Sequence, residues 1–113
     1  MELSKDEIER YLRHISLKEI GISGQLLLKK SSVLCVGSGG LGSPVLMYLA
    51  ACGVGRIGIL DYDVVEKSNL HRQVIHSTKW IGKNKTDSAK ARILEINPNC
   101  RVEIYNLKLT NKN

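Results

Sequence analysis

The sequence predicts an α/β fold, a parallel sheet whose strands alternate with helices. Three observations predict it. An apolar run over 32–36 leads into a glycine-rich turn at 37–42, and a helical pattern of apolar residues follows that turn. A second predicted strand over 56–60 is closed by Asp61, and the chain ends with a further helix pattern and an alternating strand pattern. This alternation favours a parallel sheet, because parallel strands must be joined by long crossover connections.

Before these elements, residues 1–31 are predicted as an N-terminal helical segment with two helices. Ser4 and Glu7 have the spacing of a capping box, which marks the start of the first helix. The residues behind them repeat at helical spacing and form one apolar stripe: Ile8, Tyr11, Leu12 and Ile15. A short second helix is expected over 25–29, just before the first strand.

The first strand and its helix follow. The strand over 32–36 is apolar throughout, which predicts that helices cover both faces of the sheet. The helix after the glycine turn is expected over 41–52, and Pro44 falls in its first turn, where a missing N–H costs little. Gly53 is a natural left-handed residue for the C-terminal end of this helix.

A long connection separates the second strand from the last helix. Residues 62–82 contain only hints of short helix, and a connection of about 20 residues usually indicates function. Asn84 can cap a helix over 85–96, and a final strand is expected over 101–107. Three strands are few for a sheet of this class, so we expect an incomplete domain.

Composition excludes several classes of protein. The 113 residues are 42% hydrophobic and 25% charged, as in ordinary globular domains, and no apolar run approaches the ~20 residues that would span a bilayer. The net charge of +6 comes from scattered basic residues, with one tryptophan and four tyrosines, so we expect no nucleic-acid partner and no membrane partner. Three distant cysteines are expected to be reduced, and no metal site is expected in this chain.

The start of the chain lacks the basic-then-apolar layout of a signal peptide, so we expect a cytoplasmic protein. Frequent lysine, asparagine and isoleucine also fit an AT-rich gene. The stroma of a plastid with its own genome is therefore an equal alternative.

The glycine-rich turn has the composition of a phosphate-binding turn. Gly37, Gly39, Gly40 and Gly42 lie between a predicted strand and a predicted helix. Glycines allow positive φ and close backbone approach, so main-chain N–H groups at the helix N-terminus can face an anion. Alone, this pattern would indicate a dinucleotide site.

Four polar residues downstream favour ATP instead. Asp61, at the end of the second strand, is placed to accept hydrogen bonds from ribose hydroxyls. Arg72 can hold phosphate oxygens with two parallel hydrogen bonds. Lys85 begins a helix, where a cation is unfavourable unless an anion lies nearby; the alternative is a lysine that points into solvent. Asn69 can bind a phosphate or a magnesium-bound water, but asparagine is also a common turn former.

These residues and their order resemble the start of the family of ThiF, MoeB and the ubiquitin-activating enzymes, over nearly the whole chain. The resemblance rests on the glycine turn and on five further segments: Arg10–His14, Gly24–Gln25, Asp61–Asp63, Ser68–Gln73 and Gly82–Lys85. It is closest to MoeB-like adenylyltransferases, which activate the sulphur-carrier subunit of molybdopterin synthase.

The resemblance implies a Rossmann-like, ATP-dependent adenylyltransferase. In that family the C-terminal glycine carboxylate of a ubiquitin-like protein attacks the α-phosphate of Mg-ATP, which gives an acyl-adenylate and pyrophosphate. Gly39 and Gly40 would lie against the nucleotide, and Asp61 would hold the ribose. Arg72 and Lys85 would bind the phosphates, with Asn69 in support.

The resemblance also implies a homodimer, because Arg13 matches an arginine that family members supply to the neighbouring subunit's ATP site. Residues 32–113 would be the first part of the ATP-binding domain. The family's magnesium-binding aspartate and its zinc-binding cysteines would lie beyond residue 113. These 113 residues alone are therefore expected to be inactive.

Three alternatives stay open. The chain could belong to a ThiF-like enzyme of thiamine synthesis, to a non-catalytic module that binds a nucleotide or a partner, or to an NAD-binding oxidoreductase. Arg72 and Lys85 argue against the oxidoreductase. Two cations at this place suit the charge of a triphosphate, which a dinucleotide lacks.

Overall fold

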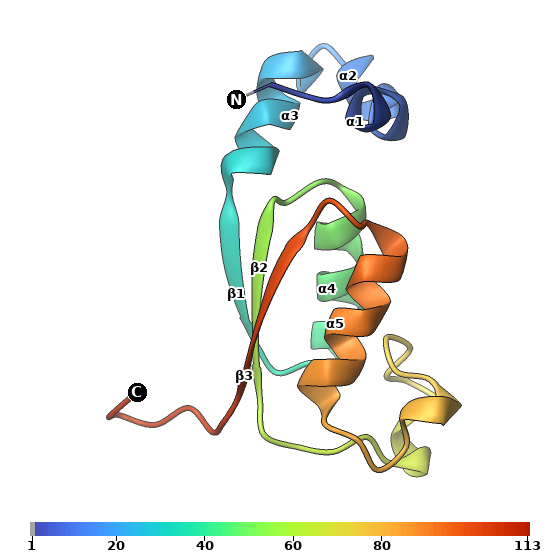
Figure 1. Ribbon diagram of the computed structural model, residues 1–113, viewed down its shortest axis with the longest axis vertical. Helices are drawn as coiled ribbons and strands as arrows, with labels where there is room; N and C mark the ends of the chain where they lie inside the picture. The colour runs from blue at the N-terminus through green and yellow to red at the C-terminus, as the bar shows by residue number, and fades with distance from the viewer. Residues whose placement is uncertain (1) are drawn as a thin grey trace.

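A three-stranded parallel sheet organises the computed structural model, which describes residues 2–113 (Figure 1). The elements in chain order are α1 Lys5–Arg10, α2 Leu12–Ile15, α3 Gly21–Lys30, β1 Ser32–Val36, α4 Gly42–Ala51, β2 Arg56–Asp61, α5 Lys85–Ile96 and β3 Arg101–Asn106. The strand order is β1-β2-β3, with Val36 beside Leu60 and Leu60 beside Tyr105. The predicted α/β class and parallel sheet are confirmed.

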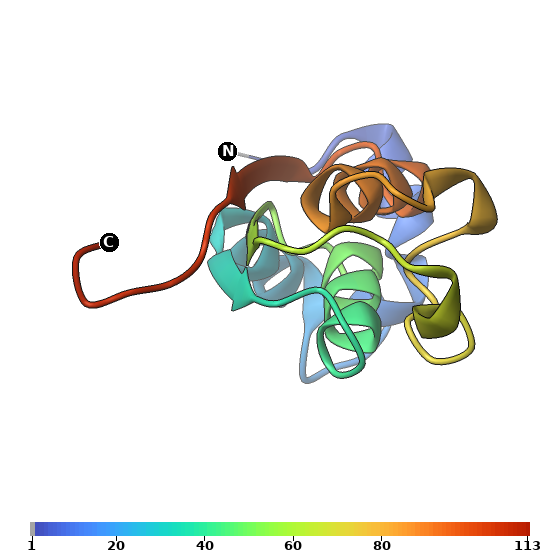
Figure 2. The ribbon, with the colours of Figure 1, turned by 90° about the horizontal axis from the view of Figure 1, so that it is seen from below.

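Both crossover helices, α4 and α5, cover the same face of the sheet (Figures 1 and 2). The prediction of helices on both faces is wrong: in β1, Leu34 is 56% exposed and Val36 55% exposed. The reason is topological. Crossovers between parallel strands are right-handed, so two successive crossovers in the same direction place their helices on one side. The other face carries an open hollow of about 440 Å³ lined partly by Leu34, Leu60 and Tyr105.

The hydrophobic core lies between α4, α5 and the covered face. Its fully buried aliphatic residues include Leu46 from α4, Ile57 and Ile59 from β2, and Ile93 from α5. Each such side chain contributes roughly 1.5–3 kcal/mol of hydrophobic stabilisation relative to exposure. Ile57 and Ile59 are two residues apart, so they point to the same face of the strand, and this alternation sets the register of the sheet.

The N-terminal helices pack at the amino ends of the strands. The capping box is confirmed: Glu7 N donates to Ser4 Oγ at 3.1 Å, and Ser4 N donates to Glu7 Oε1 at 3.0 Å. The predicted single stripe is wrong, because the helix is interrupted at Tyr11 and both Ile8 and Leu12 are exposed. The second helix, α3, begins at Gly21, earlier than predicted.

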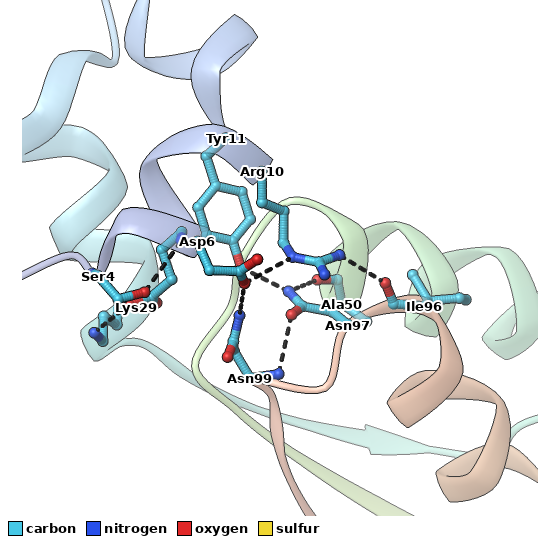
Figure 3. A network of polar contacts seen from close by, with 10 residues as sticks. Ser4, Asp6, Arg10, Tyr11, Lys29, Ala50, Ile96, Asn97 and Asn99 are labelled. Carbon is cyan, nitrogen blue, oxygen red and sulfur yellow. Dashed lines mark hydrogen bonds and ion pairs between the residues drawn. The ribbon is translucent and has the colours of Figure 1, made fainter.

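A buried polar network fixes this helical segment to the sheet (Figure 3). Asn97 Nδ2 donates to the Tyr11 hydroxyl at 2.6 Å and to the Ala50 carbonyl at 2.8 Å. Arg10 donates to the Ile96 carbonyl at 3.1 Å. Ala50 and Ile96 lie near the ends of α4 and α5 that lead into the next strand, so the network joins α1 to both crossovers.

The connection between β2 and α5 contains two short 3₁₀ helices, Lys67–Asn69 and Thr78–Trp80. The observed ends of α5 match the predicted ones, and β3 is one residue shorter than predicted. Among residues 2–113, no helix has the length and apolar character needed to cross a membrane.

Candidate nucleotide site

The glycine turn is a tight connection between β1 and α4. Gly37 has a φ of +94°, which favours glycine, and its N–H donates to the Leu60 carbonyl at 2.7 Å. A Cβ at Gly42 would overlap the carbonyl oxygen of Gly37 and lie 2.9 Å from its carbonyl carbon. The turn therefore needs glycine at 37 for its dihedral angle and at 42 for close approach of the backbone.

Asp61 holds the turn from the neighbouring strand. Its Oδ2 accepts hydrogen bonds from Ser38 N at 2.9 Å and Ser38 Oγ at 3.0 Å. Its Oδ1 accepts from Tyr62 N at 2.7 Å and Asp63 N at 3.0 Å. Burial alone would raise the pKa of Asp61, but these hydrogen bonds favour the carboxylate more strongly, and the pKa lies below its usual value. Asp61 lies where it was predicted, and it already has a structural task there.

The loop after β2 places two side chains against the glycines. Arg72 Nη1 lies 3.4 Å from the position that a Cβ would occupy on Gly40. Gln73 Nε2 lies 3.2 Å from the corresponding position on Gly39. Asn69 holds this segment, because its carbonyl accepts from Arg72 N at 3.2 Å and from Gln73 N at 2.9 Å. The structure thus brings Arg72 to the turn, and it shows Asn69 as a backbone turn former.

Lys85 is the first residue of α5 and only 7% exposed. The alternative of a lysine pointing into solvent is therefore wrong. Its Nζ lies 3.8 Å from Asp63 Oδ2, and its backbone N–H donates to the Asp63 carbonyl at 3.0 Å. A buried cation at a helix N-terminus is electrostatically unfavourable, and the distant, largely exposed carboxylate of Asp63 compensates little. An anionic ligand would be stabilised here.

His76 lies close enough to Lys85 to be influenced by its charge, and it was not predicted as part of a site. It is buried, its Nδ1 is 2.7 Å from Ser88 Oγ, and its Nε2 has no hydrogen-bond partner within the described residues. Burial lowers the pKa of the His76 imidazole below its usual value and the charge of Lys85 lowers it further, outweighing the opposite influence of the Ser38 backbone and Asp61. His76 therefore stays neutral and adds no positive charge beside Lys85.

The lowered pKa of His76 predicts how stability depends on pH. The unfolded chain protonates this histidine near its ordinary value, while the folded chain binds the proton only at lower pH. Between about pH 7.5 and about pH 5.5, the free energy of unfolding should therefore fall, and it should fall less in His76→Gln. Urea unfolding across this range measures both slopes. His71→Gln, at an exposed position of the same loop, is the control, and equal slopes for His76→Gln and wild type would contradict the prediction.

A hollow of about 220 Å³ adjoins the turn at the carboxyl ends of β1 and β2. Its lining includes Gly37, Asp61 and Tyr62 together with apolar side chains of Val36 and Leu60. Apolar walls with a few polar groups are typical of sites for small molecules. In parallel sheets ligands bind at this edge, beyond the carboxyl ends of the strands.

Arg13 is exposed on α2, at the other end of the molecule from the glycine turn (Figure 1). The six residues of β2 alone separate the two ends by roughly 20 Å. Arg13 is the one predicted site residue that the structure keeps apart from the others. Within residues 2–113 no group of three or more metal-ligating side chains forms, and Cys35, Cys52 and Cys100 are free.

Comparison with known proteins gives the family of the chain. Residues 11–113 match the ThiF family. A probable molybdopterin-synthase adenylyltransferase of Porphyra purpurea is 52% identical over 110 residues, which is 97% of this chain and 29% of that protein. The chain thus spans less than a third of the length of this relative.

Two solved structures share the fold of this chain, and each of them contains an adenine nucleotide. The tRNA N6-threonylcarbamoyladenosine dehydratase TcdA of E. coli, in complex with AMP, superimposes with a TM-score of 0.90 at 30% identity, over 97% of this chain and 44% of that one. MccB of E. coli with ATP gives a TM-score of 0.82 at 34% identity, over 96% of this chain and 33% of that one.

Proposed function

The chain belongs to the ThiF family, and on that basis we propose that it forms the ATP-binding part of an adenylyltransferase. The substrate we propose is the C-terminal glycine carboxylate of a ubiquitin-like sulphur-carrier protein, in the synthesis of molybdenum cofactor. The observation that carries the proposal is the burial of the Lys85 cation at the start of α5, in a fold that also brings Arg72 against the glycine turn.

The residues fit an adenosine triphosphate that lies along the turn. Gly37 and Gly42 shape the turn, and the missing side chains of Gly39 and Gly40 let Gln73 and Arg72 lie close against it. Arg72 and Lys85 would bind those oxygens through charge-assisted hydrogen bonds. Asn69 supports the site through its backbone bonds to the Arg72 segment.

In the proposed reaction a carboxylate oxygen of the carrier bonds to the α-phosphorus, and the bond from that phosphorus to the bridging oxygen of pyrophosphate breaks. Negative charge then builds up on the leaving pyrophosphate. Lys85 would stabilise that charge without rearranging, because burial and the α5 backbone already fix its position. Magnesium would bind the phosphates as well, held by the aspartate expected beyond residue 113.

We further propose that Arg13 acts in a neighbouring copy of the chain. It lies at the amino end of the sheet, so it cannot reach the turn of its own molecule. In a two-fold symmetric dimer each copy would supply its arginine to the other. The location in cytoplasm or plastid stroma stays a prediction, as does the zinc expected outside this sequence.

ThiF-like activation in thiamine synthesis remains the second candidate, because the residues described above would serve either carrier protein. A non-catalytic nucleotide-binding module is the third. The intact mass of the native protein, captured from its source with an antibody against this chain, separates the enzyme from the module. A mass well above 12.6 kDa supports the enzyme; a mass of 12.6 kDa supports the module.

Ligand choice tests the site. ATP should raise the thermal midpoint of the protein at its native length, and NAD should not. Lys85→Met keeps the buried aliphatic stem but removes the charge, so ATP should bind about 10- to 100-fold more weakly. Isothermal calorimetry measures this change. The matched control is Lys67→Met, which removes an exposed charge from the same loop. Unchanged ATP affinity in Lys85→Met would contradict the proposed phosphate site.

A further inference from the structure

Gln73 carries a buried hydrogen-bond acceptor that the protein itself leaves unused. The residue is 4% exposed, and its Oε1 has no hydrogen-bond partner among residues 2–113. A buried polar atom without a partner costs about 1–3 kcal/mol, and such atoms are rare in folded proteins. The other buried glutamine, Gln25, has both ends of its amide paired, as is usual for buried polar groups. Its Nε2 donates to the Cys52 carbonyl, and its Oε1 lies within hydrogen-bond distance of His14 Nδ1.

The position of Gln73 along the turn indicates which part of a nucleotide it would meet. Asp61 contacts the turn at Ser38, Gln73 lies against Gly39, and Arg72 lies against Gly40. Successive residues of the turn thus face the proposed ribose ligand, then Gln73, then the proposed phosphate ligand. Gln73 therefore lies between the ribose and the phosphates.

The amide oxygen of Gln73 can pair with only some groups of ATP. An amide oxygen needs a hydrogen-bond donor, and a triphosphate offers only acceptors. The donors of ATP are the two ribose hydroxyls and the adenine amino group. Dinucleotide-type sites place the carboxylate at the second strand against the 2′-hydroxyl, which assigns that group to Asp61. The 3′-hydroxyl is then the donor closest to the phosphates.

We propose that Gln73 is a further nucleotide-binding residue whose amide oxygen accepts a hydrogen bond from the ribose 3′-hydroxyl. This inference rests on the proposed function of the site as an ATP site. No bond holds Oε1, and the final torsion of a glutamine is broad, so the amide can rotate to present its oxygen above Gly39. There the absent side chain of glycine leaves room for the Gln73 amide itself, whose Nε2 lies 3.2 Å from the position a Cβ would occupy.

The test compares wild type with one variant, using three nucleotides, in the protein at its native length. Gln73→Met replaces the amide with an apolar side chain of similar length. Wild type should bind 3′-deoxy-ATP about tenfold more weakly than ATP, and Gln73→Met should bind the two about equally. The preference for ATP over 2′-deoxy-ATP should be the same in both proteins, because Asp61 is unchanged.

Stability gives a second readout with a matched control. Gln73→Met removes an unpaired polar atom, so its thermal midpoint without ligand should equal or exceed that of wild type. Gln25→Met orphans the Cys52 carbonyl, and its midpoint should fall by about 5 °C. A fall in Gln73→Met as large as in Gln25→Met would show that the amide has a structural role and would overturn the proposal.

The nucleotide results separate the possible failures. A 3′-deoxy penalty that persists in Gln73→Met, or that is absent from wild type, would overturn the role of Gln73 while ATP binding remains. If ATP gives no protection to wild type, the proposed ATP site itself is wrong, and the role of Gln73 fails with it.

Discussion

Alanine at position 42 is expected to destabilise the protein by about 2–3 kcal/mol and to abolish nucleotide binding. The added Cβ would overlap the Gly37 carbonyl oxygen. The backbone fixes the positions of both atoms, so no side-chain rotation can relieve the overlap. The turn must therefore open, which separates Gly37 from Leu60 and disturbs the surface that faces phosphate. Urea unfolding measures the first effect, and calorimetry with ATP measures the second.

Gly40→Ala separates the two effects. A Cβ at Gly40 makes only an ordinary contact, 3.4 Å from Arg72 Nη1, so the free energy of unfolding should stay close to that of wild type. The methyl group would nevertheless occupy the outer surface of the turn and weaken ATP binding. Equal stability of Gly42→Ala and Gly40→Ala would show that the turn adapts to a side chain at 42, contrary to the geometry.

Asp61→Asn is expected to lower the free energy of unfolding by about 3 kcal/mol, because hydrogen bonds to a charged group are stronger than those between neutral groups. The carboxylate accepts four hydrogen bonds, and an asparagine amide turns one accepting oxygen into a donor that faces other donors. Ser38 or the pair Tyr62 and Asp63 would lose its partner. The turn would then be held less firmly, and ATP protection should disappear together with stability.

The pH dependence of the same variant provides a check. The pKa of Asp61 is lowered in the folded protein, so its stabilisation is present above the ordinary carboxyl value and is lost as pH falls through the folded value. As the pH falls, the free energy of unfolding should therefore decrease less in Asp61→Asn than in wild type. Glu66→Gln, which removes an exposed carboxylate nearby, is the control and should leave stability and acid unfolding unchanged.

The sheet and its crossovers could be predicted because the sequence marks them locally. The bounds of β1 and α5 match the prediction, since turn residues border a short apolar run in one case and a periodic pattern in the other. The uncovered face could not be predicted in this way. Leu34 and Val36 are as apolar as core residues, and only the direction of the two crossovers decides that no helix within residues 2–113 covers them.

The charged residues of the candidate site could be picked out from the sequence, but the contacts that support them could not. Asp61, Arg72 and Lys85 were recognisable because charged residues at a strand end, in a long loop and at a helix start are unusual placements. The burial of Lys85 and the free amide of Gln73 depend on tertiary packing, which no local pattern encodes. The one signal for Gln73 was its position directly after Arg72, in a segment that was already of interest.

The spacing within the loop has an evolutionary consequence. Arg72, Gln73 and His76 reach the turn or the helix behind it from one five-residue segment, so the length of that segment fixes all their positions together. Substitutions there change one contact each. An insertion or deletion between Asn69 and His76 would instead displace the whole set, so related proteins should keep the length of this segment unchanged.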